Sequence, residues 1–141
     1  MPSTTYQDID PMRAVISLLG ASDRISLDVI IRQGLPLSAL DKLETYGFSA
    51  EELGIVSSSV IKRRLAQGRN LTINEGDHIY RASLAILLAN YVFGNQKKAS
   101  IWLLKPRKAL RGRTALQATE TTPGLQAVEV LLERLRHGFA A

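Results

Sequence analysis

Apolar residues recur every three or four positions along most of the chain, and no stretch alternates apolar and polar residues for long. This spacing is typical of amphipathic α-helices. Glycine, proline and capping residues divide the pattern into helices predicted at about 11–19, 26–33, 36–46, 50–53, 60–67, 75–93, 99–103 and 123–137. The sequence therefore predicts an all-α fold with an N-terminal helical region, 1–70, and a C-terminal helical region, 71–141.

The segment 75–93 has the most apolar pattern of the chain. Its apolar side chains extend beyond a single helical face: Ile79, Ala82, Leu84, Ile86, Leu87, Leu88, Ala89 and Phe93. Such a helix is buried on most sides. We therefore expect it at the centre of the fold, with Trp102 from the next helix in the core beside it.

The segment 49–68 has the pattern of a helix-turn-helix. Ser49 to Glu52 is a capping-box sequence, Gly54 ends that very short helix, and a second helix follows over 60–67. A short helix, a glycine turn and a basic helix in this order are typical of DNA-binding motifs. The register is imperfect, because a late core position of the motif falls on Arg63 and Leu65 supplies an apolar residue two positions later.

The second helix of this motif carries residues that suit DNA. Ser58 and Ser59 lie near its start, and Lys62 and Arg63 follow one turn later on the same side. Hydroxyl and cationic side chains contact phosphates and base edges. Two interpretations remain open, a DNA-recognition helix and a helical hairpin with a solvated basic face.

The charge of the chain is unevenly distributed. Its 18 basic and 13 acidic residues give a net charge of +5. Residues 53–74 hold four basic residues and no acid, and residues 97–113 hold seven and no acid, which leaves a net −6 on the rest. The second basic island is densest over 105–113, where glycine and proline predict a loop. Its interpretations are contact with a nucleic-acid backbone, docking on an acidic protein surface, and solubility.

Several classes of function lack the residues they need. The chain has no cysteine for disulfides or thiolate metal sites, and His78 and His137 lie in different predicted helices without ligand spacing. Phosphate-loop and nucleophile-elbow motifs are absent. The longest apolar stretch, 84–89, is too short for a membrane span, and residues 1–10 do not resemble a signal peptide. We expect a non-enzymatic cytoplasmic protein without metal or cofactor.

A run at residues 71–81 and a set of later positions together form a specific pattern. The run is Leu71-Thr72-x-x-Glu75-x-Asp77-x-x-Tyr80-Arg81, and the later positions are Phe93, Ala99, Trp102, Leu103, Pro106, Leu110, Gly112, Thr119, Gly124, Val128, Leu132 and 135–138. In these residues about half of the chain resembles the Xre/MbcA/ParS antitoxins of RES-type toxin–antitoxin systems. Upstream, residues 57–64 are similar to the recognition segment of that family, with the double arginine kept but Val60 in place of the typical threonine and Ser59 where a basic residue is common.

The resemblance implies an all-helical antitoxin with two partners. Its C-terminal domain would bind a RES-domain toxin that consumes NAD and block the toxin's pocket, and toxin and antitoxin together would repress their shared promoter. The expected operator-DNA contacts are Ser58, Ser59, Lys62, Arg63 and Arg69. The alternative is a stand-alone helix-turn-helix transcriptional regulator without a toxin.

The C-terminal tail is expected to reach the toxin's entrance. A dinucleotide pocket is electropositive around the pyrophosphate, which the acidic body of this chain and the carboxylate of Ala141 would complement. The expected toxin contacts are Arg111, Arg113, Glu133, Arg136, His137, Gly138, Phe139 and Ala141. The alternatives are a frayed tail and a basic loop that contacts DNA instead of an acidic toxin face.

A homodimer within a larger toxin–antitoxin complex is also expected. The resemblance implies self-association through the Xre-like part, and one short recognition helix reaches only a few base pairs. The apolar segments 15–19 and 29–31 are either the dimer surface or part of the core.

Overall fold

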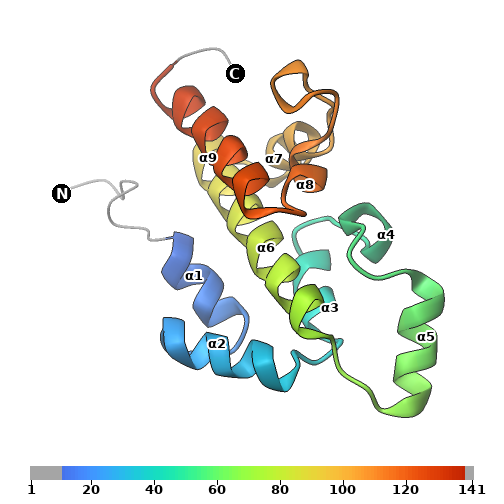
Figure 1. Cartoon of the computed structure of the whole chain (residues 1–141). Helices are drawn as coiled ribbons and strands as arrows, with labels where there is room; N and C mark the ends of the chain where they lie inside the picture. Colours follow the sequence, from blue (N-terminus) through green and yellow to red (C-terminus); the bar gives the residue numbers. More distant parts are fainter. Residues whose placement is uncertain (1–10, 139–141) are drawn as a thin grey trace.

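The computed structural model describes residues 11–138, and these fold around one long central helix. This helix, α6 (Ile73–Phe93), packs against helices from both ends of the chain (Figure 1). The prediction of an all-α fold is confirmed, and residues 11–138 contain no strand. Within the same range, no helix is long and apolar enough to cross a membrane.

The ends of α6 follow from its sequence. Thr72 caps the helix: its hydroxyl accepts a hydrogen bond from the Glu75 backbone, and the Glu75 carboxylate accepts one from the Thr72 backbone. Gly94 ends the helix in the left-handed region, with φ 61°. The buried side chains of α6 face several directions, and Ile79, Ala85, Ile86 and Ala89 are fully buried. The predicted central position is therefore confirmed.

Three helices of the N-terminal region pack against α6. They are α1 (Pro11–Leu18), α2 (Arg24–Gln33) and α3 (Ala39–Glu44). A Cβ atom on Gly76 would lie 3.3 Å from Ile31 Cγ2 and 3.4 Å from Leu35 Cδ1, so the missing side chain leaves room for the segment 31–35 against α6.

The segments considered for a dimer surface are mostly part of this packing. Val15, Ile16, Leu19 and Ile31 are at most 9% exposed within one chain. A buried side chain has no surface left for a second copy, so the core interpretation holds for these four residues. Val29 differs, because 45% of it is exposed.

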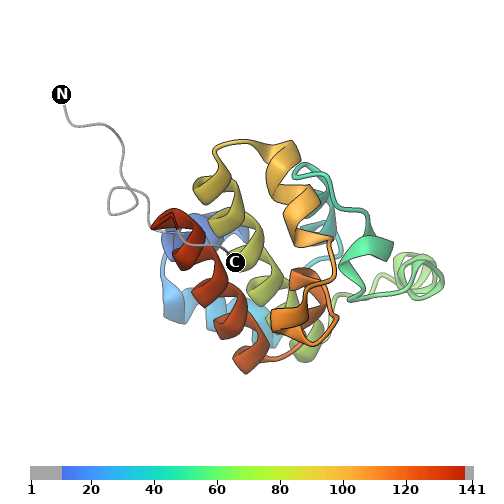
Figure 2. The same cartoon turned by 90° about the horizontal axis from the view of Figure 1, so that it is seen from above.

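The pair α4 (Ala50–Leu53) and α5 (Ser58–Gln67) follows α3. The capping box of α4, made by Ser49 and Glu52, and the left-handed Gly54 that ends it are as predicted. Ser57 caps α5, and Gly68 ends it. Figures 1 and 2 show α5 at the edge of the molecule, with most of its surface away from the other helices.

The C-terminal region adds α7 (Gln96–Leu103), the 3-10 turn η1 (Lys108–Leu110), α8 (Ala115–Ala118) and α9 (Thr122–Arg136). Helix α8 is not among the helices predicted from the pattern of apolar residues, although Thr114 and Gln117 form its capping box. The cap of α9 is Thr121, one residue before the predicted Thr122. Buried side chains from both regions form one cluster around α6, and the division at residue 70 stays a prediction.

Candidate functional site

The outer face of α5 carries the polar residues predicted to contact DNA. Ser58, Ser59, Lys62 and Arg63 are all exposed. Lys62 and Arg63 lie three and four positions after Ser59 and so flank the same face of the helix. No acidic side chain pairs with Lys62 or Arg63 among the described residues. The face is therefore free to meet an anionic partner.

The inner face of α5 is attached to the fold by few contacts. Val60 and Ile61 are half-buried and pack against the core, but α5 has no fully buried residue. Arg64 also points inward, and its guanidinium forms an ion pair with Glu75 at the start of α6. The two adjacent arginines therefore differ: Arg63 faces solvent, and Arg64 is engaged within the molecule.

The Glu75 carboxylate has a second partner. Its Oε1 atom accepts a hydrogen bond from the Thr72 backbone at 2.8 Å in addition to the one from Arg64. Burial raises the pKa of Glu75, but the hydrogen bonds from Arg64 and Thr72 outweigh burial and hold the pKa below its ordinary value. No local sequence pattern indicates this ion pair, because eleven positions and a turn separate the two residues.

One expectation for this region changes, and one predicted DNA contact lies outside the helix. Leu65 does not supply the missing core residue, because it is 64% exposed, and Arg63, at the core position itself, is exposed as well. Arg69 lies beyond the glycine that ends α5, in the connection to α6, where it is exposed. The connection itself is fixed by the Leu71 backbone, which donates to the Leu35 carbonyl at 2.9 Å.

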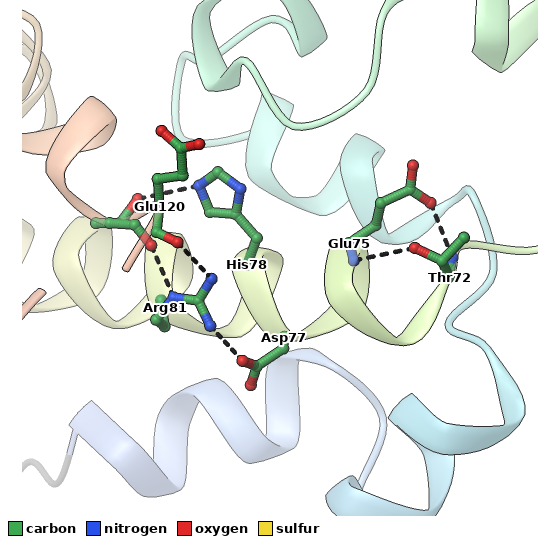
Figure 3. Close-up of polar contacts among 7 residues, drawn as sticks. Thr72, Glu75, Asp77, His78, Arg81 and Glu120 are labelled. Carbon is green, nitrogen blue, oxygen red and sulfur yellow. Dashed lines mark hydrogen bonds and ion pairs between the residues drawn. The ribbon is translucent and has the colours of Figure 1, made fainter. Parts of the chain in front are cut away.

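Figure 3 shows that the motif at 71–81 joins α6 to the link between α8 and α9. Arg81 donates from Nε to the Thr119 carbonyl at 2.7 Å and from Nη2 to the Glu120 carbonyl at 3.0 Å, and it forms an ion pair with Asp77. Its side chain is only 12% exposed. These residues therefore have a structural role, which is to fix the start of α9 on α6.

His78 lies beside this clamp. Its Nε2 atom is 3.5 Å from Thr119 Oγ1, whose hydroxyl donates to the Leu116 carbonyl at 2.6 Å. Burial and the positive charge of Arg81 lower the pKa of His78, against the opposing effect of Glu120 and Asp77. Within residues 11–138 no group of histidine, aspartate and glutamate side chains is arranged to hold a metal ion.

One arginine of the second basic island is part of the core packing. The guanidinium carbon of Arg107 lies 4.2 Å from the centroid of the Trp102 ring, and its Nη2 atom donates to the Trp102 carbonyl at 3.2 Å. Backbone hydrogen bonds from Arg107 to Arg113 and from Gly112 to Arg107 close the loop. Arg107 therefore holds the loop in place. Trp102 is buried, as predicted.

The four other cations of the loop 105–113 are exposed. Arg111 and Arg113, predicted to contact the toxin, are exposed together with Lys105 and Lys108. None of the four has an acidic partner among the described residues. Arg111 ends the η1 turn in the left-handed region, with φ 57°, and thereby shapes the loop.

The predicted tail residues lie only partly within the described range. At the end of α9, Glu133 accepts hydrogen bonds from Arg136 and lies 3.5 Å from His137 Nε2. Gly138 follows with φ 84°. Phe139 and Ala141 lie outside the described residues. The structure thus brings Glu133, Arg136 and His137 together at the end of the helix.

The two basic islands lie in different parts of the molecule. In Figure 1 the loop between α7 and α8 and the C-terminal end of α9 both reach the upper end, whereas α5 lies at the lower right. The structure therefore separates the residues predicted to contact DNA from Arg111, Arg113 and the end of α9, which are predicted to contact the toxin.

Comparisons with known proteins bear on the same regions. Residues 88–138 match the family model described as the antitoxin Xre/MbcA/ParS C-terminal toxin-binding domain. The chain is also similar to Antitoxin Xre of Pseudomonas putida (strain KT2440), with 27% identity over 130 residues, which cover 91% of this chain and 82% of the relative. The matched domain runs from within α6 through α9 and includes the basic loop.

Proposed function

This chain belongs to the Xre/MbcA/ParS family of antitoxins, and from this premise we propose that it neutralises a RES-domain, NAD-degrading toxin and represses its own operon. The observation that carries the proposal is the match of residues 88–138 to a toxin-binding domain. It acts by binding rather than by catalysis, in the cytoplasm, where both partners are present.

The toxin would bind at the end of the molecule that is uppermost in Figure 1. Arg111 and Arg113 would dock on the toxin surface, and the end of α9, with Glu133, Arg136, His137 and Gly138, would lie at the pocket entrance. Phe139 and Ala141 would enter the pocket. The exposure of the two loop arginines and their lack of acidic partners support the first contact, and the position of α9 supports the second.

Operator DNA would bind to the outer face of α5. Ser58, Ser59, Lys62 and Arg63 would contact the groove and its phosphates, and Arg69 would contact the backbone beside them. The exposed and unpaired cations on the outer face of α5 support this assignment. A homodimer within a larger toxin–antitoxin complex would place two such helices on one operator.

The antitoxin function is tested by co-expressing this chain with the protein encoded by the neighbouring gene, which the proposal expects to be a RES-domain toxin. We expect the neighbour alone to stop growth and to deplete NAD. Co-expression should restore growth and the NAD level, and the two proteins should co-purify. A variant that ends at Gly138 leaves the described helices intact and tests the tail. It should still co-purify with the toxin but fail to restore NAD; full protection by this variant would refute pocket blocking by residues 139–141.

The alternative is a stand-alone transcriptional regulator. The unpaired cations on α5 support this function equally well, because DNA binding through these cations requires no toxin. The two functions differ in the co-expression test: a stand-alone regulator binds DNA but neither rescues growth nor co-purifies with a RES-domain neighbour.

A further inference from the structure

We propose that Glu75 is a positioning residue for DNA binding: by holding Arg64 against the start of α6, it sets the direction of α5 and keeps Arg64 away from DNA. The inference rests on the proposed DNA-binding function. It concerns two residues that do not themselves face the DNA, and it assigns opposite roles to the adjacent arginines of α5.

The packing of α5 makes its direction depend on this ion pair. Val60 and Ile61 attach the first half of the helix to the core. In the second half, Leu65, Ala66 and Gln67 are exposed. Arg64 is therefore the side chain that holds the second half of the helix, and the next attachment along the chain is the Leu71 backbone, beyond Gly68. Without the ion pair, we expect the second half of α5 to be held only through this connection.

The ion pair is shielded from solvent, which distinguishes it from ordinary surface pairs. The side chains of Arg64 and Glu75 are only 15% and 18% exposed. Surface ion pairs are weak because water screens them, and shielding strengthens the attraction. The hydrogen bond from the Thr72 backbone also fixes the Glu75 carboxylate before Arg64 reaches it. The acceptor is thus preoriented by the capping box of α6.

The two arginines diverge because consecutive residues on a helix point about 100° apart. Arg63 is directed to solvent beside Lys62, and Arg64 is directed to α6. If Arg64 is released, α5 gains a third free cation while its direction becomes less defined. A free cation strengthens binding to any sequence, whereas a poorly oriented helix reads base edges less well. Release should therefore raise non-specific affinity and lower sequence discrimination.

Glu75→Gln isolates this effect. Glutamine at the same position still completes a capping box, so the start of α6 is preserved while the negative charge is lost. We would first measure hydrogen–deuterium exchange of the free protein. Amides of α5 should exchange faster in the variant, and those of α9 should be unchanged. This measurement requires no DNA and tests the attachment of α5 directly.

Binding is then measured with two duplexes of equal length at several salt concentrations. One carries the sequence upstream of the chain's own gene, and the other carries the same bases in shuffled order. For Glu75→Gln we expect discrimination between the duplexes to fall about fivefold, as a loss of roughly 1 kcal/mol would give. Binding to the shuffled duplex should strengthen, and its log–log salt slope should steepen by about 0.9 for one added phosphate contact.

Two further variants make the result specific. Arg64→Met keeps most of the apolar stem without the charge, so it should lose discrimination but gain no salt dependence. Glu52→Gln alters the equivalent capping residue of α4, which has no arginine partner within residues 11–138, and should match the wild type. A variant that was merely unstable would exchange faster everywhere and bind both duplexes less well.

The outcomes separate this inference from the function on which it rests. If the wild type does not distinguish the duplexes, the proposed operator binding fails, and the role of Glu75 in DNA binding fails with it. If the wild type distinguishes them and Glu75→Gln does so equally well, the inference alone is refuted. Unchanged exchange in α5 would refute it too, because the ion pair would then not hold the helix.

Discussion

Arg107 stacks on Trp102, with its guanidinium carbon 4.2 Å from the ring centroid, and Trp102 packs against Phe93 at 6.1 Å between ring centroids. The cation, the indole and the phenyl ring connect the basic loop to the core next to α6. One of the seven cations of this island thus stabilises the fold. The cations that remain for a partner are those whose side chains face solvent.

We predict that Arg107→Ala destabilises the protein by about 1–2 kcal/mol, the range of a partly desolvated cation–π contact. The substitution also removes the hydrogen bond to the Trp102 carbonyl. Denaturant unfolding measures the change. Lys108→Ala is the control, because Lys108 is exposed and lacks an acidic partner within residues 11–138. Equal stability of the two variants would show that the stacking contributes nothing.

We predict a larger loss for Gly124→Ala. A Cβ atom at Gly124 would overlap the carbonyl group of Ala118, which belongs to the backbone and cannot move without shifting α8. Overpacking of this kind typically costs about 1–3 kcal/mol. Gly76→Ala is the matched control, because Gly76 also lies in a helix but faces side-chain atoms of Ile31 and Leu35, at 3.3 and 3.4 Å, instead of a backbone group. Gly76→Ala should remain within about 1 kcal/mol of the wild type, as measured by thermal unfolding.

The sequence predicted most of the helices because their ends depend on local chemistry. The capping box at Ser49 and the glycine at 54 are sufficient to delimit α4. The four residues of α8 escaped prediction because a single turn has no apolar periodicity, and only its capping box signals it. The cap of α9 was misplaced by one residue because consecutive threonines, Thr121 and Thr122, offer the same hydroxyl.

The candidate site was less predictable, because its arrangement depends on long-range contacts. Ser59, Lys62 and Arg63 share an exposed face as helical spacing indicates, and Ser58 is exposed beside them. The inward turn of Arg64 depends on Glu75, eleven positions away and in another helix, and no local pattern connects them. In the sequence, Arg107 likewise does not differ from the other cations of the loop, and only the fold shows that it stacks on Trp102.

We predict that His78 makes stability fall at mildly acidic pH. Burial and Arg81 lower the pKa of His78 below its ordinary 6.5, so just below that pH the unfolded chain binds a proton that the folded chain does not. The free energy of unfolding therefore decreases as the pH falls below the ordinary pKa of histidine. Well above that pH, His78 is neutral in both states and has no such effect. His78→Gln should lose less stability than the wild type between about pH 7.5 and about pH 5.5. Denaturant unfolding over this pH range measures the change, and an equal loss of stability in His78→Gln and the wild type would refute the prediction.

We predict that Lys62→Gln and Arg63→Gln each weaken binding to the upstream duplex and reduce its salt slope by about 0.9, because each removes one phosphate contact. Fluorescence anisotropy over a range of salt concentrations measures both quantities. Lys105→Gln removes an exposed cation from the other basic island and should leave the slope unchanged. A slope that falls equally for Lys105→Gln would show that DNA contacts both islands.

Reversing the charges of Arg111 and Arg113 should show whether the basic loop contacts the toxin or DNA. Both side chains are exposed and lie within the residues matched by the toxin-binding domain, at the end of the molecule that also holds the end of α9. The double variant Arg111→Glu, Arg113→Glu would repel an acidic toxin face, so we expect weaker toxin binding with unchanged affinity for the upstream duplex. Calorimetric titration with the toxin and anisotropy with the duplex give the two affinities. Intact toxin binding with lost DNA binding would instead assign the loop to DNA, because a reversed charge repels phosphate as strongly as it repels a carboxylate.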